Sequence, residues 1–297
     1  MNDYKSGFVT VIGRPNVGKS TLINHIIGQK IAIMSDKPQT TRSRIQCVYT
    51  TEEVQIIFLD TPGIHKPKYK LGEYMLKAAE GTLKEVDVIF FVVDATEKFG
   101  GGENYIIERL KSTSKPVILV INKLDLIERE QSLPIIASYS DKYKFAAIVP
   151  ISAMDGTNVE VLLDEAKKLL PNGPQYYPAD MVTDQPERLI IAELVREKVL
   201  HSTEDEVPHS IAVDIDEITK RDNGDNYIRA TIYVERESQK GILIGKKGSM
   251  LKNIGQLSRP EIEMLLGTKV YLDLWVKVKK NWRNSLGAIQ DFGLGSD

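Results

Sequence analysis

The fold is decided by the stretch Gly13-Arg14-Pro15-Asn16-Val17-Gly18-Lys19-Ser20, which fits the pattern G-x-x-x-x-G-K-[ST]. An apolar, strand-like run at 8–12 precedes it, and a helical pattern over 18–27 follows it. Two glycines let the main-chain N–H groups of such a loop wrap a polyphosphate, and the positive end of the next helix adds to the attraction. Lys19 is expected to reach the β- and γ-phosphates, and the hydroxyl of Ser20 is expected to bind Mg²⁺. The stretch therefore predicts a nucleotide-binding α/β domain.

Short apolar runs alternate with helical patterns from the N-terminus to about Leu170. The predicted strands cover 8–12, 54–59, 88–93, 117–121 and 146–151, and the predicted helices cover 18–27, 72–85, 103–111, 133–142 and 159–170. Continuous Val, Ile and Phe of this kind is typical of a parallel sheet covered by helices on both faces. The runs 45–50 and 54–59 are separated by only three residues and indicate an antiparallel hairpin instead. We expect a mostly parallel sheet with one antiparallel edge strand.

A proline-rich stretch separates this region from the rest of the chain, with Pro171, Gly173, Pro174, Pro178 and Pro186. Such a density excludes a regular helix or a central strand. We therefore predict a first domain at 1–172, a linker at 173–186 and a second domain at 187–297. The second domain is expected to contain helices at 188–200, 249–266 and 282–289 and strands at 211–215, 227–234 and 270–278, with a charged face opposite the apolar face of the first helix. These elements predict a smaller α+β domain.

Length and composition agree with two globular domains. The chain has 297 residues, a mass of 33.4 kDa, 42% hydrophobic residues and 27% charged residues, which argues against a disordered or fibrous protein. The single cysteine, Cys47, excludes an internal disulfide framework and a multi-cysteine metal site. The polar first residues do not resemble a signal peptide, and the longest apolar stretch, 86–93, is too short to span a bilayer. We expect a cytoplasmic protein.

Three further motifs follow predicted strands at the end where open α/β sheets bind ligands. Asp60-Thr61-Pro62-Gly63 follows 54–59, Asn122-Lys123-Leu124-Asp125 follows 117–121, and Ser152-Ala153 follows 146–151. The Asp60 carboxylate can hold Mg²⁺ through water, and the N–H of Gly63 can meet a γ-phosphate. Taken alone, an Asp followed by Pro-Gly is an ordinary turn, so this assignment depends on the phosphate loop upstream.

The second of these motifs, Asn122–Asp125, favours guanine as the base. The two oxygens of Asp125 can accept from the ring N–H and the exocyclic amine of guanine, whereas adenine offers no such pair of donors. A bidentate contact of this kind discriminates strongly because the wrong base leaves the carboxylate unpaired. Asn122 is expected to brace the loop, the Lys123 stem to lie over the base, and the Ala153 N–H to donate to the guanine oxygen.

In order along the chain, these motifs together with Thr40-Thr41-Arg42 resemble the signature motifs of translation-factor-class small GTPases. The resemblance implies a first switch within 28–44 and a second switch over about 60–71, which includes His65, Lys66 and Lys68. Thr41 is the expected ligand of Mg²⁺ and γ-phosphate, with Thr40 as the alternative. Both switches are expected to be ordered by the γ-phosphate and released on hydrolysis. The predicted nucleotide-contacting residues are Gly13, Arg14, Pro15, Asn16, Val17, Gly18, Lys19, Ser20, Thr21, Asp60, Thr61, Pro62, Gly63, Ile64, Asn122, Lys123, Leu124, Asp125, Ser152 and Ala153.

Two positions bear on hydrolysis. Many signalling GTPases have a glutamine after Asp-x-x-Gly that orients the attacking water, whereas Ile64 stands there in this chain. An apolar side chain cannot do this, so another group must, and slow intrinsic hydrolysis is expected. Asn16 resembles the asparagine with which GTPases of this class hold a potassium ion beside the phosphates; the alternative is an ordinary loop hydrogen bond.

The net charge of −2 and the pI of about 6.2 hide two opposed stretches in the second domain. The stretch from Lys240 to Arg283 contains ten basic and three acidic residues, a net charge of +7. The stretch from Gln185 to Glu237 contains thirteen acidic and seven basic residues, a net charge of −6. A basic stretch is most often a solvated face, so its charge alone does not predict a nucleic-acid partner.

The basic stretch contains a G-x-x-G turn, and this turn favours RNA binding over an ordinary solvated face. The predicted RNA-binding residues are Ile244, Gly245, Lys246, Lys247, Gly248, Ser249 and Lys252. Two glycines allow a phosphate backbone to approach closely, and two lysines supply charge. The order of elements from 187 to 285 resembles a type II KH domain, which implies RNA binding. Trp282 and Arg283 could contribute to the RNA groove, although Trp275 and Trp282 could equally be packed.

A GTPase domain joined by a proline-rich linker to a C-terminal KH domain resembles a bacterial family of ribosome-assembly GTPases over almost the whole chain. The resemblance implies binding to 16S rRNA near its 3′ end, a role in maturation of the small ribosomal subunit, a monomer, and peripheral association with the cytoplasmic face of the membrane. The alternative is a GTPase that regulates cell-cycle or membrane partners and uses the KH-like domain for protein contact. A metabolic ATPase is opposed by Asp125.

Overall fold

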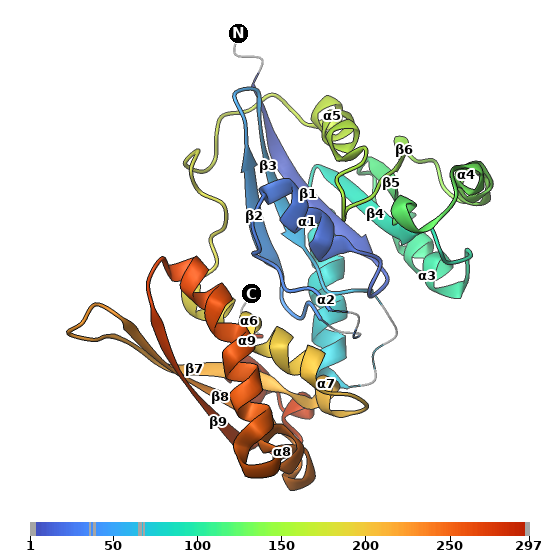
Figure 1. Cartoon of the computed structure of the whole chain (residues 1–297). Coiled ribbons are helices and arrows are strands. Elements are labelled where there is room, and N and C mark those ends of the chain that lie inside the picture. The colour runs from blue at the N-terminus through green and yellow to red at the C-terminus, as the bar shows by residue number, and fades with distance from the viewer. Residues whose placement is uncertain (1–3, 36, 38–39, 65–66, 68, 295–297) are drawn as a thin grey trace. The chain divides into compact units, whose positions relative to one another are not determined.

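The computed structural model of the chain describes residues 4–35, 37, 40–64, 67 and 69–294, which form two units (Figure 1). The first unit comprises Met1–Ala32, Thr41–Pro67 and Gly72–Asp184, and the second comprises Ile33–Thr40, Lys68–Leu71 and Gln185–Asp297. The division therefore differs from the predicted one in two respects. Most of the linker belongs to the first unit, and parts of both predicted switches group with the second.

A six-stranded sheet forms the centre of the first unit. Its strands are β1 (Lys5–Gly13), β2 (Ile45–Thr50), β3 (Val54–Asp60), β4 (Val88–Asp94), β5 (Val117–Asn122) and β6 (Ala147–Pro150), in the order β2-β3-β1-β4-β5-β6. β2 is the antiparallel edge strand, and the other neighbours are parallel. The mostly parallel sheet and its antiparallel edge hairpin are thus confirmed.

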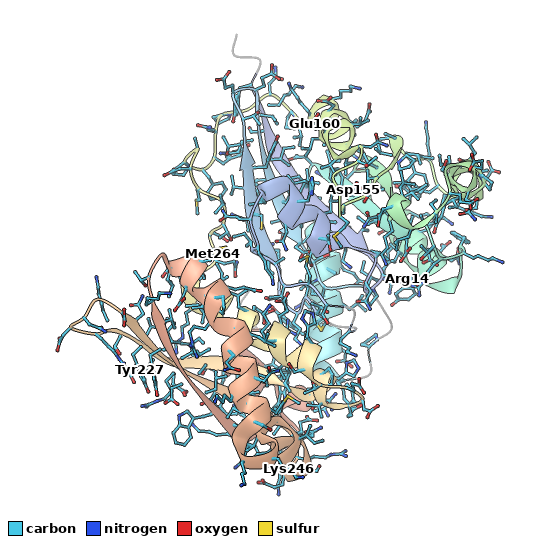
Figure 2. All side chains as sticks on the ribbon, in the orientation of Figure 1. Arg14, Asp155, Glu160, Tyr227, Lys246 and Met264 are labelled. Carbon is cyan, nitrogen blue, oxygen red and sulfur yellow. The ribbon has the colours of Figure 1, made fainter. Side chains whose placement is uncertain are left out.

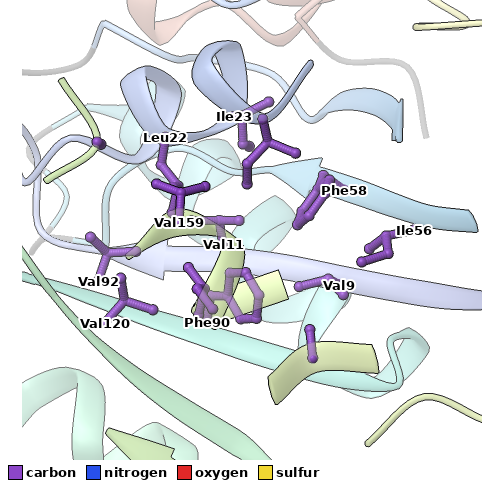
Figure 3. Close-up of a cluster of buried hydrophobic side chains, with 14 of the residues drawn as sticks. Val9, Val11, Leu22, Ile23, Ile56, Phe58, Phe90, Val92, Val120 and Val159 are labelled. Atoms are coloured by element: carbon purple, nitrogen blue, oxygen red, sulfur yellow. The ribbon is translucent and has the colours of Figure 1, made fainter. Parts of the chain in front are cut away.

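Helices cover both faces of this sheet: α1 (Lys19–Ile27), α2 (Lys70–Glu85), α3 (Gly101–Leu110), α4 (Ser132–Ser140) and α5 (Val159–Leu169). Alternate residues of β4 show why the strands are apolar throughout. Phe90 and Val92 face the core under α1 and α5, whereas Ile89 and Phe91 face the core under α2, α3 and α4. Figure 3 shows the first of these cores, where Leu22 and Val159 reach down onto the strands.

The proline-rich segment is fastened along the first unit. Asn172 bridges to Lys5, and the main chain of Val182 accepts a hydrogen bond of 2.9 Å from Val48 N–H. Between these ends, the buried side chain of Gln55 donates to the carbonyl of Tyr177 at 2.8 Å and accepts from the N–H of Tyr176 at 2.7 Å. The segment therefore lacks regular structure but is held by specific hydrogen bonds.

The second unit is a three-stranded sheet with helices packed on one face (Figure 1). Its main elements are α6 (Glu187–Ser202), α7 (Val207–Ser210), β7 (Ala212–Lys220), β8 (Asn226–Val234), α8 (Glu237–Ile244), α9 (Ser249–Leu266), β9 (Val270–Val278) and α10 (Leu286–Asp291). β8 lies between β7, to which it is antiparallel, and β9, to which it is parallel. The predicted α+β arrangement and the bounds of α9 and β9 are confirmed.

One detail at the end of the second unit differs from expectation, and another decides between two alternatives. The predicted last helix is broken into a short turn at Trp282–Asn284 and α10, because the Ser285 side chain caps a new helix by accepting from Ala288 N–H. Trp282 is fully buried and its indole N–H donates to the Ser210 carbonyl at 2.8 Å, so this side chain is packed and does not line an RNA groove. Within the described residues, no helix has the length and apolar character needed to cross a membrane.

Candidate functional site: a nucleotide site and a lysine-bearing turn

The candidate nucleotide site lies at the carboxyl ends of the strands of the first unit. β1 pairs with β3 on one side and with β4 on the other. The order of strands in the sheet therefore reverses at β1, since β2 and β3 lie on one side of it and β4 to β6 lie on the other. Open α/β sheets bind ligands at such a switch point. The phosphate loop leaves β1 there, and Asp60 and Asn122 end β3 and β5.

The phosphate loop has a geometry that only glycine allows at Gly18. This residue has a φ of +95°, and a Cβ there would lie 2.1 Å from Nδ2 of Asn122. The same Nδ2 donates to the Val17 carbonyl at 2.8 Å. Asn122 therefore braces the loop as predicted, and it requires the close approach that a glycine permits.

Lys19 lies inside the loop that it is expected to serve. It is buried, and its Nζ donates to the carbonyls of Arg14 at 2.8 Å and Gly13 at 3.4 Å. Burial lowers the pKa of Lys19 to about 8, although the charge of Asp60 opposes the shift. The ammonium group is thus held by main-chain oxygens at the mouth of a loop suited to phosphates.

Three oxygen-bearing side chains converge where Mg²⁺ is expected. Ser20 Oγ donates to Asp60 Oδ2 at 2.8 Å and lies 3.1 Å from Thr41 Oγ1. The other carboxylate oxygen, Asp60 Oδ1, is buried without a hydrogen-bond partner among the described residues. Burial raises the pKa of Asp60 to about 6 against the opposing charge of Lys19. A buried, underpartnered carboxylate beside two hydroxyls fits a hard cation such as Mg²⁺.

The structure also distinguishes the two threonines of the first switch. Thr41 is buried beside Ser20, whereas the hydroxyl of Thr40 donates to the carbonyl of Lys37 at 2.6 Å. The geometry therefore favours Thr41 as the metal-side threonine.

The segment after Asp60 closes against the phosphate loop. The Thr61 hydroxyl donates to the Val11 carbonyl at 2.9 Å, and a Cβ on Gly63 would lie 2.8 Å from the nitrogen of Pro15. Ile64 is 2% exposed and belongs to the apolar core, with its N–H donating to the Gly13 carbonyl at 3.1 Å. This apolar side chain is packed in the core and offers no group that could orient a water. The predicted second-switch residues His65, Lys66 and Lys68 lie outside the described residues.

The expected base pocket brings the remaining two motifs together. Asp125 Oδ1 accepts from the Ser152 hydroxyl at 2.7 Å, which orients the carboxylate. Asn122 Oδ1 accepts from the Ala153 N–H at 2.9 Å, so the donation of this N–H to guanine stays a prediction. Leu124 N–H donates to the Ile151 carbonyl at 3.1 Å and joins the two loops. The arrangement presents an exposed carboxylate whose orientation is fixed by the Ser152 hydroxyl.

Lys123 has a partner that the sequence analysis did not single out. Its ammonium group forms an ion pair with Asp94, which ends β4. The position of Asp94 at the carboxyl end of a predicted strand is the signal that could have identified it. Within the phosphate loop, Asn16 has a left-handed φ of +66°, and the Arg14 side chain pairs with Glu103 of α3 at 2.9 Å.

The G-x-x-G turn of the second unit joins α8 to α9 and presents its lysines outward. Gly245 has a φ of +70°, and a Cβ there would lie 2.8 Å from Cβ of Met250. Lys246, Lys247 and Lys252 are exposed, and Ile244 is half-buried against the core. Figure 2 shows Lys246 at the opposite end of α9 from Met264. The turn thus offers two lysines and an open main chain to a phosphate backbone.

Comparison with known proteins decides the family. Residues 8–123 match the family model of 50S ribosome-binding GTPases, and residues 206–283 match that of KH domains. The chain is 46% identical to Era crystallised with MgGDPNP and nucleotides 1506–1542 of 16S ribosomal RNA, over 99% of this chain and 100% of that one, with a TM-score of 0.96. The chain belongs to the Era family of GTPases. It is likewise 46% identical to a variant of Aquifex aeolicus Era bound to GDP·AlF4⁻, over 98% of this chain and 100% of that one, with a TM-score of 0.95.

Membership of the Era family makes the chain a GTP-binding and GTP-hydrolysing protein with a KH domain. In this Era-family chain the four nucleotide motifs meet at one edge of one sheet, and the KH turn carries its lysines outside the protein core. The resemblance inferred from the motifs is thereby confirmed.

Proposed function

We propose that this protein is a GTP-switched RNA-binding assembly factor that binds 16S rRNA near its 3′ end and assists maturation of the small ribosomal subunit. The observation that carries the proposal is the lysine-bearing turn Gly245–Gly248 on the same chain as a complete guanine-nucleotide site. The similar Era structure holds a GTP analogue and the 3′ segment of 16S rRNA together. The nucleotide is expected to control how the KH domain presents this turn to RNA.

For the nucleotide site, we propose that Ser20, Thr41 and Asp60 hold Mg²⁺. When bound, the ion neutralises charge on the β- and γ-phosphates. Asp60 must be deprotonated to do so, and Ser20 Oγ, which donates its hydrogen to Asp60, must direct a lone pair to the ion. Lys19 moves from the loop carbonyls to the phosphates, and Asp125 selects guanine. Because Ile64 is buried, a main-chain group, a cation or a partner molecule orients the attacking water.

RNA binding is tested by reversing the charge of the turn. Lys246→Glu/Lys247→Glu is compared with Lys220→Glu/Lys269→Glu, which makes the same charge change at exposed positions of the same unit. Affinity is measured for a synthetic RNA of the segment 1506–1542 with a GTP analogue present. The turn variant is expected to bind at least about tenfold more weakly and to lower the slope of log affinity against log salt by about 2. Equal affinities of the two double variants would refute the proposed role of the turn.

We further propose that Asn16 holds K⁺ beside the phosphates. Its place in the phosphate loop and the absence of a polar side chain at position 64 support a cation that stabilises charge in the transition state. GTP hydrolysis is expected to be faster in K⁺ than in Na⁺ buffer, and Asn16→Ala is expected to remove the difference. Equal rates of GTP hydrolysis in both buffers would contradict the proposed K⁺ site.

For location, we propose the cytoplasm with peripheral association to the cytoplasmic face of the membrane, and we propose a monomer. The membrane proposal rests on resemblance to the family alone. Cell fractionation tests it, because the protein should partition between the soluble and membrane fractions and should leave the membrane in high salt. A protein found wholly in the soluble fraction at low salt contradicts it.

A further inference from the structure

Three consecutive charged residues of α6 are buried, although the sequence predicts a charged face opposite the apolar face of this helix. Arg196, Glu197 and Lys198 are 2%, 1% and 8% exposed. Burying charge is unfavourable unless each group is paired and hydrogen-bonded. The contacts of these side chains therefore indicate what they do.

Arg196 is aimed at the main chain of the first switch. Glu193, one turn earlier on α6, accepts from Arg196 Nε at 2.7 Å and from Nη2 at 2.5 Å, so the guanidinium plane is fixed. The same Nη2 donates to the main-chain carbonyl of Thr40. A charge-assisted bond to a carbonyl depends on where the backbone lies and not on the side chain of Thr40.

Glu197 and His201 hold the other end of the same segment. Glu197 Oε1 accepts from the main-chain N–H of Met34 at 2.8 Å, and a ring nitrogen of His201 lies 3.0 Å from the Met34 carbonyl. Ile33 next to it is 1% exposed and packs in the core of the second unit. Ile33–Thr40 thus groups with the second unit through contacts to its main chain at both ends.

This segment is joined covalently to a residue of the nucleotide site. The carbonyl that Arg196 holds belongs to the peptide bond between Thr40 and Thr41, and Thr41 Oγ1 lies 3.1 Å from Ser20 Oγ. A peptide unit is planar and rigid. A movement of the Thr41 main chain toward or away from the metal site must therefore displace the carbonyl to which Arg196 donates.

From α6 the network continues to the helix that follows the RNA turn. Lys198 Nζ donates to Glu197 Oε2 at 2.7 Å and to Glu261 of α9. α9 begins directly after Gly248. One chain of charged contacts therefore links the main chain of the first switch to α9.

We propose that Arg196 and Glu197 are positioning residues that read the state of the first switch from its main chain and make RNA affinity depend on the bound nucleotide. The inference rests on the proposed function, because it concerns RNA binding at the α8–α9 turn. It assigns the coupling to two residues that touch neither nucleotide nor RNA. By linkage, the factor by which a GTP analogue tightens RNA binding equals the factor by which RNA tightens binding of the analogue.

The test compares Arg196→Met with Arg188→Met in the full chain. Methionine fills a similar volume without donors, and Arg188 lies on the same helix but donates to the Ile215 carbonyl of β7. RNA affinity is measured with GDP and with a GTP analogue, and analogue affinity is measured with and without RNA. The thermal midpoint of each variant reports folding, and Glu197→Leu provides a second variant if Arg196→Met does not fold.

We expect Arg196→Met to keep the wild-type RNA affinity with GDP, within about twofold, and to bring both coupling factors to about one. A coupling of about 5- to 150-fold is the usual range for such linked sites. Arg188→Met should keep the wild-type factors. Retention of both factors in Arg196→Met, or an equal loss in Arg188→Met, overturns the inference alone. A wild-type factor of one overturns the nucleotide switch as well.

Discussion

At the scale of single residues, Asp125 is expected to determine the choice of base. Its carboxylate is oriented by the Ser152 hydroxyl at 2.7 Å, and we expect it to accept two hydrogen bonds from guanine. Asp125→Asn replaces one acceptor with a donor, so the variant should lose about tenfold to a thousandfold in GDP affinity and gain affinity for xanthosine diphosphate. Competition between the two nucleotides for the variant and the wild type measures this. Unchanged guanine selectivity in Asp125→Asn contradicts the assignment.

Two neighbouring residues give nucleotide binding a defined pH range. Asp60 has a pKa raised to about 6 by burial, and its proton must leave before Mg²⁺ binds, so affinity for Mg·GDP should fall as the pH drops below about 6. Lys19 has a pKa lowered to about 8 by burial, and it loses its charge as the pH rises above that value, which weakens phosphate binding. Calorimetry from about pH 5 to about pH 9 covers both pKa values. The affinity for Mg·GDP should be highest at a pH between these two values.

Asp60→Asn provides the control for the acid limb. The amide does not titrate, so this variant should bind Mg·GDP weakly and lose most of the dependence on pH below about 6. What remains belongs to the phosphate of the nucleotide itself. An unchanged acid limb in Asp60→Asn would show that Asp60 is not the titrating group.

At the scale of elements, Gln55 on β3 fixes the proline-rich segment. Its amide makes hydrogen bonds with the main chain of Tyr176 and Tyr177, and it is fully buried. Gln55→Leu leaves these main-chain groups without partners, which should lower the free energy of unfolding by about 2 kcal/mol. It should also speed proteolytic cleavage within 173–184. Urea unfolding and limited proteolysis measure the two effects, with the exposed Gln29→Leu as the matched control. Equal cleavage rates in both variants would mean that Gln55 does not hold the segment.

The elements that the sequence predicted well are those with a strong local pattern. The five parallel strands and α9 were found because continuous apolar runs and helical spacing are read within one segment. The strand-end motifs were placed correctly because parallel strands bring their carboxyl ends to one edge. The break between Trp282–Asn284 and α10 was missed because a serine cap inside a helical pattern leaves little trace in hydrophobic spacing.

The contacts that sequence could not predict are the ones between distant segments. Arg196 and Glu197 have the spacing of a solvated helix face, and nothing near them in sequence shows that their partners are main-chain groups about 160 residues earlier. The same holds for Gln55, whose partners lie beyond residue 175. In both cases the burial of a polar side chain depends on a partner that is distant in the sequence.

At the scale of the whole molecule, the net charge of −2 is the sum of two opposed stretches, and the structure gives each a place. The basic stretch contains the exposed turn between α8 and α9, where Lys246 and Lys247 face outward. The acidic stretch includes Glu193 and Glu197, which are used inside the second unit to hold Arg196 and the first switch. The net charge of the chain therefore does not indicate the kind of binding partner, whereas the distribution of charge between the two stretches does.

We propose that the first unit binds guanine nucleotide, that the second unit binds RNA, and that the bound nucleotide controls RNA binding. The most direct measurement is the affinity of the wild-type protein for RNA of the segment 1506–1542 with a GTP analogue and with GDP, both with Mg²⁺ present. We expect tighter binding with the analogue, by about fivefold or more. The same affinity in the two nucleotide states would contradict it.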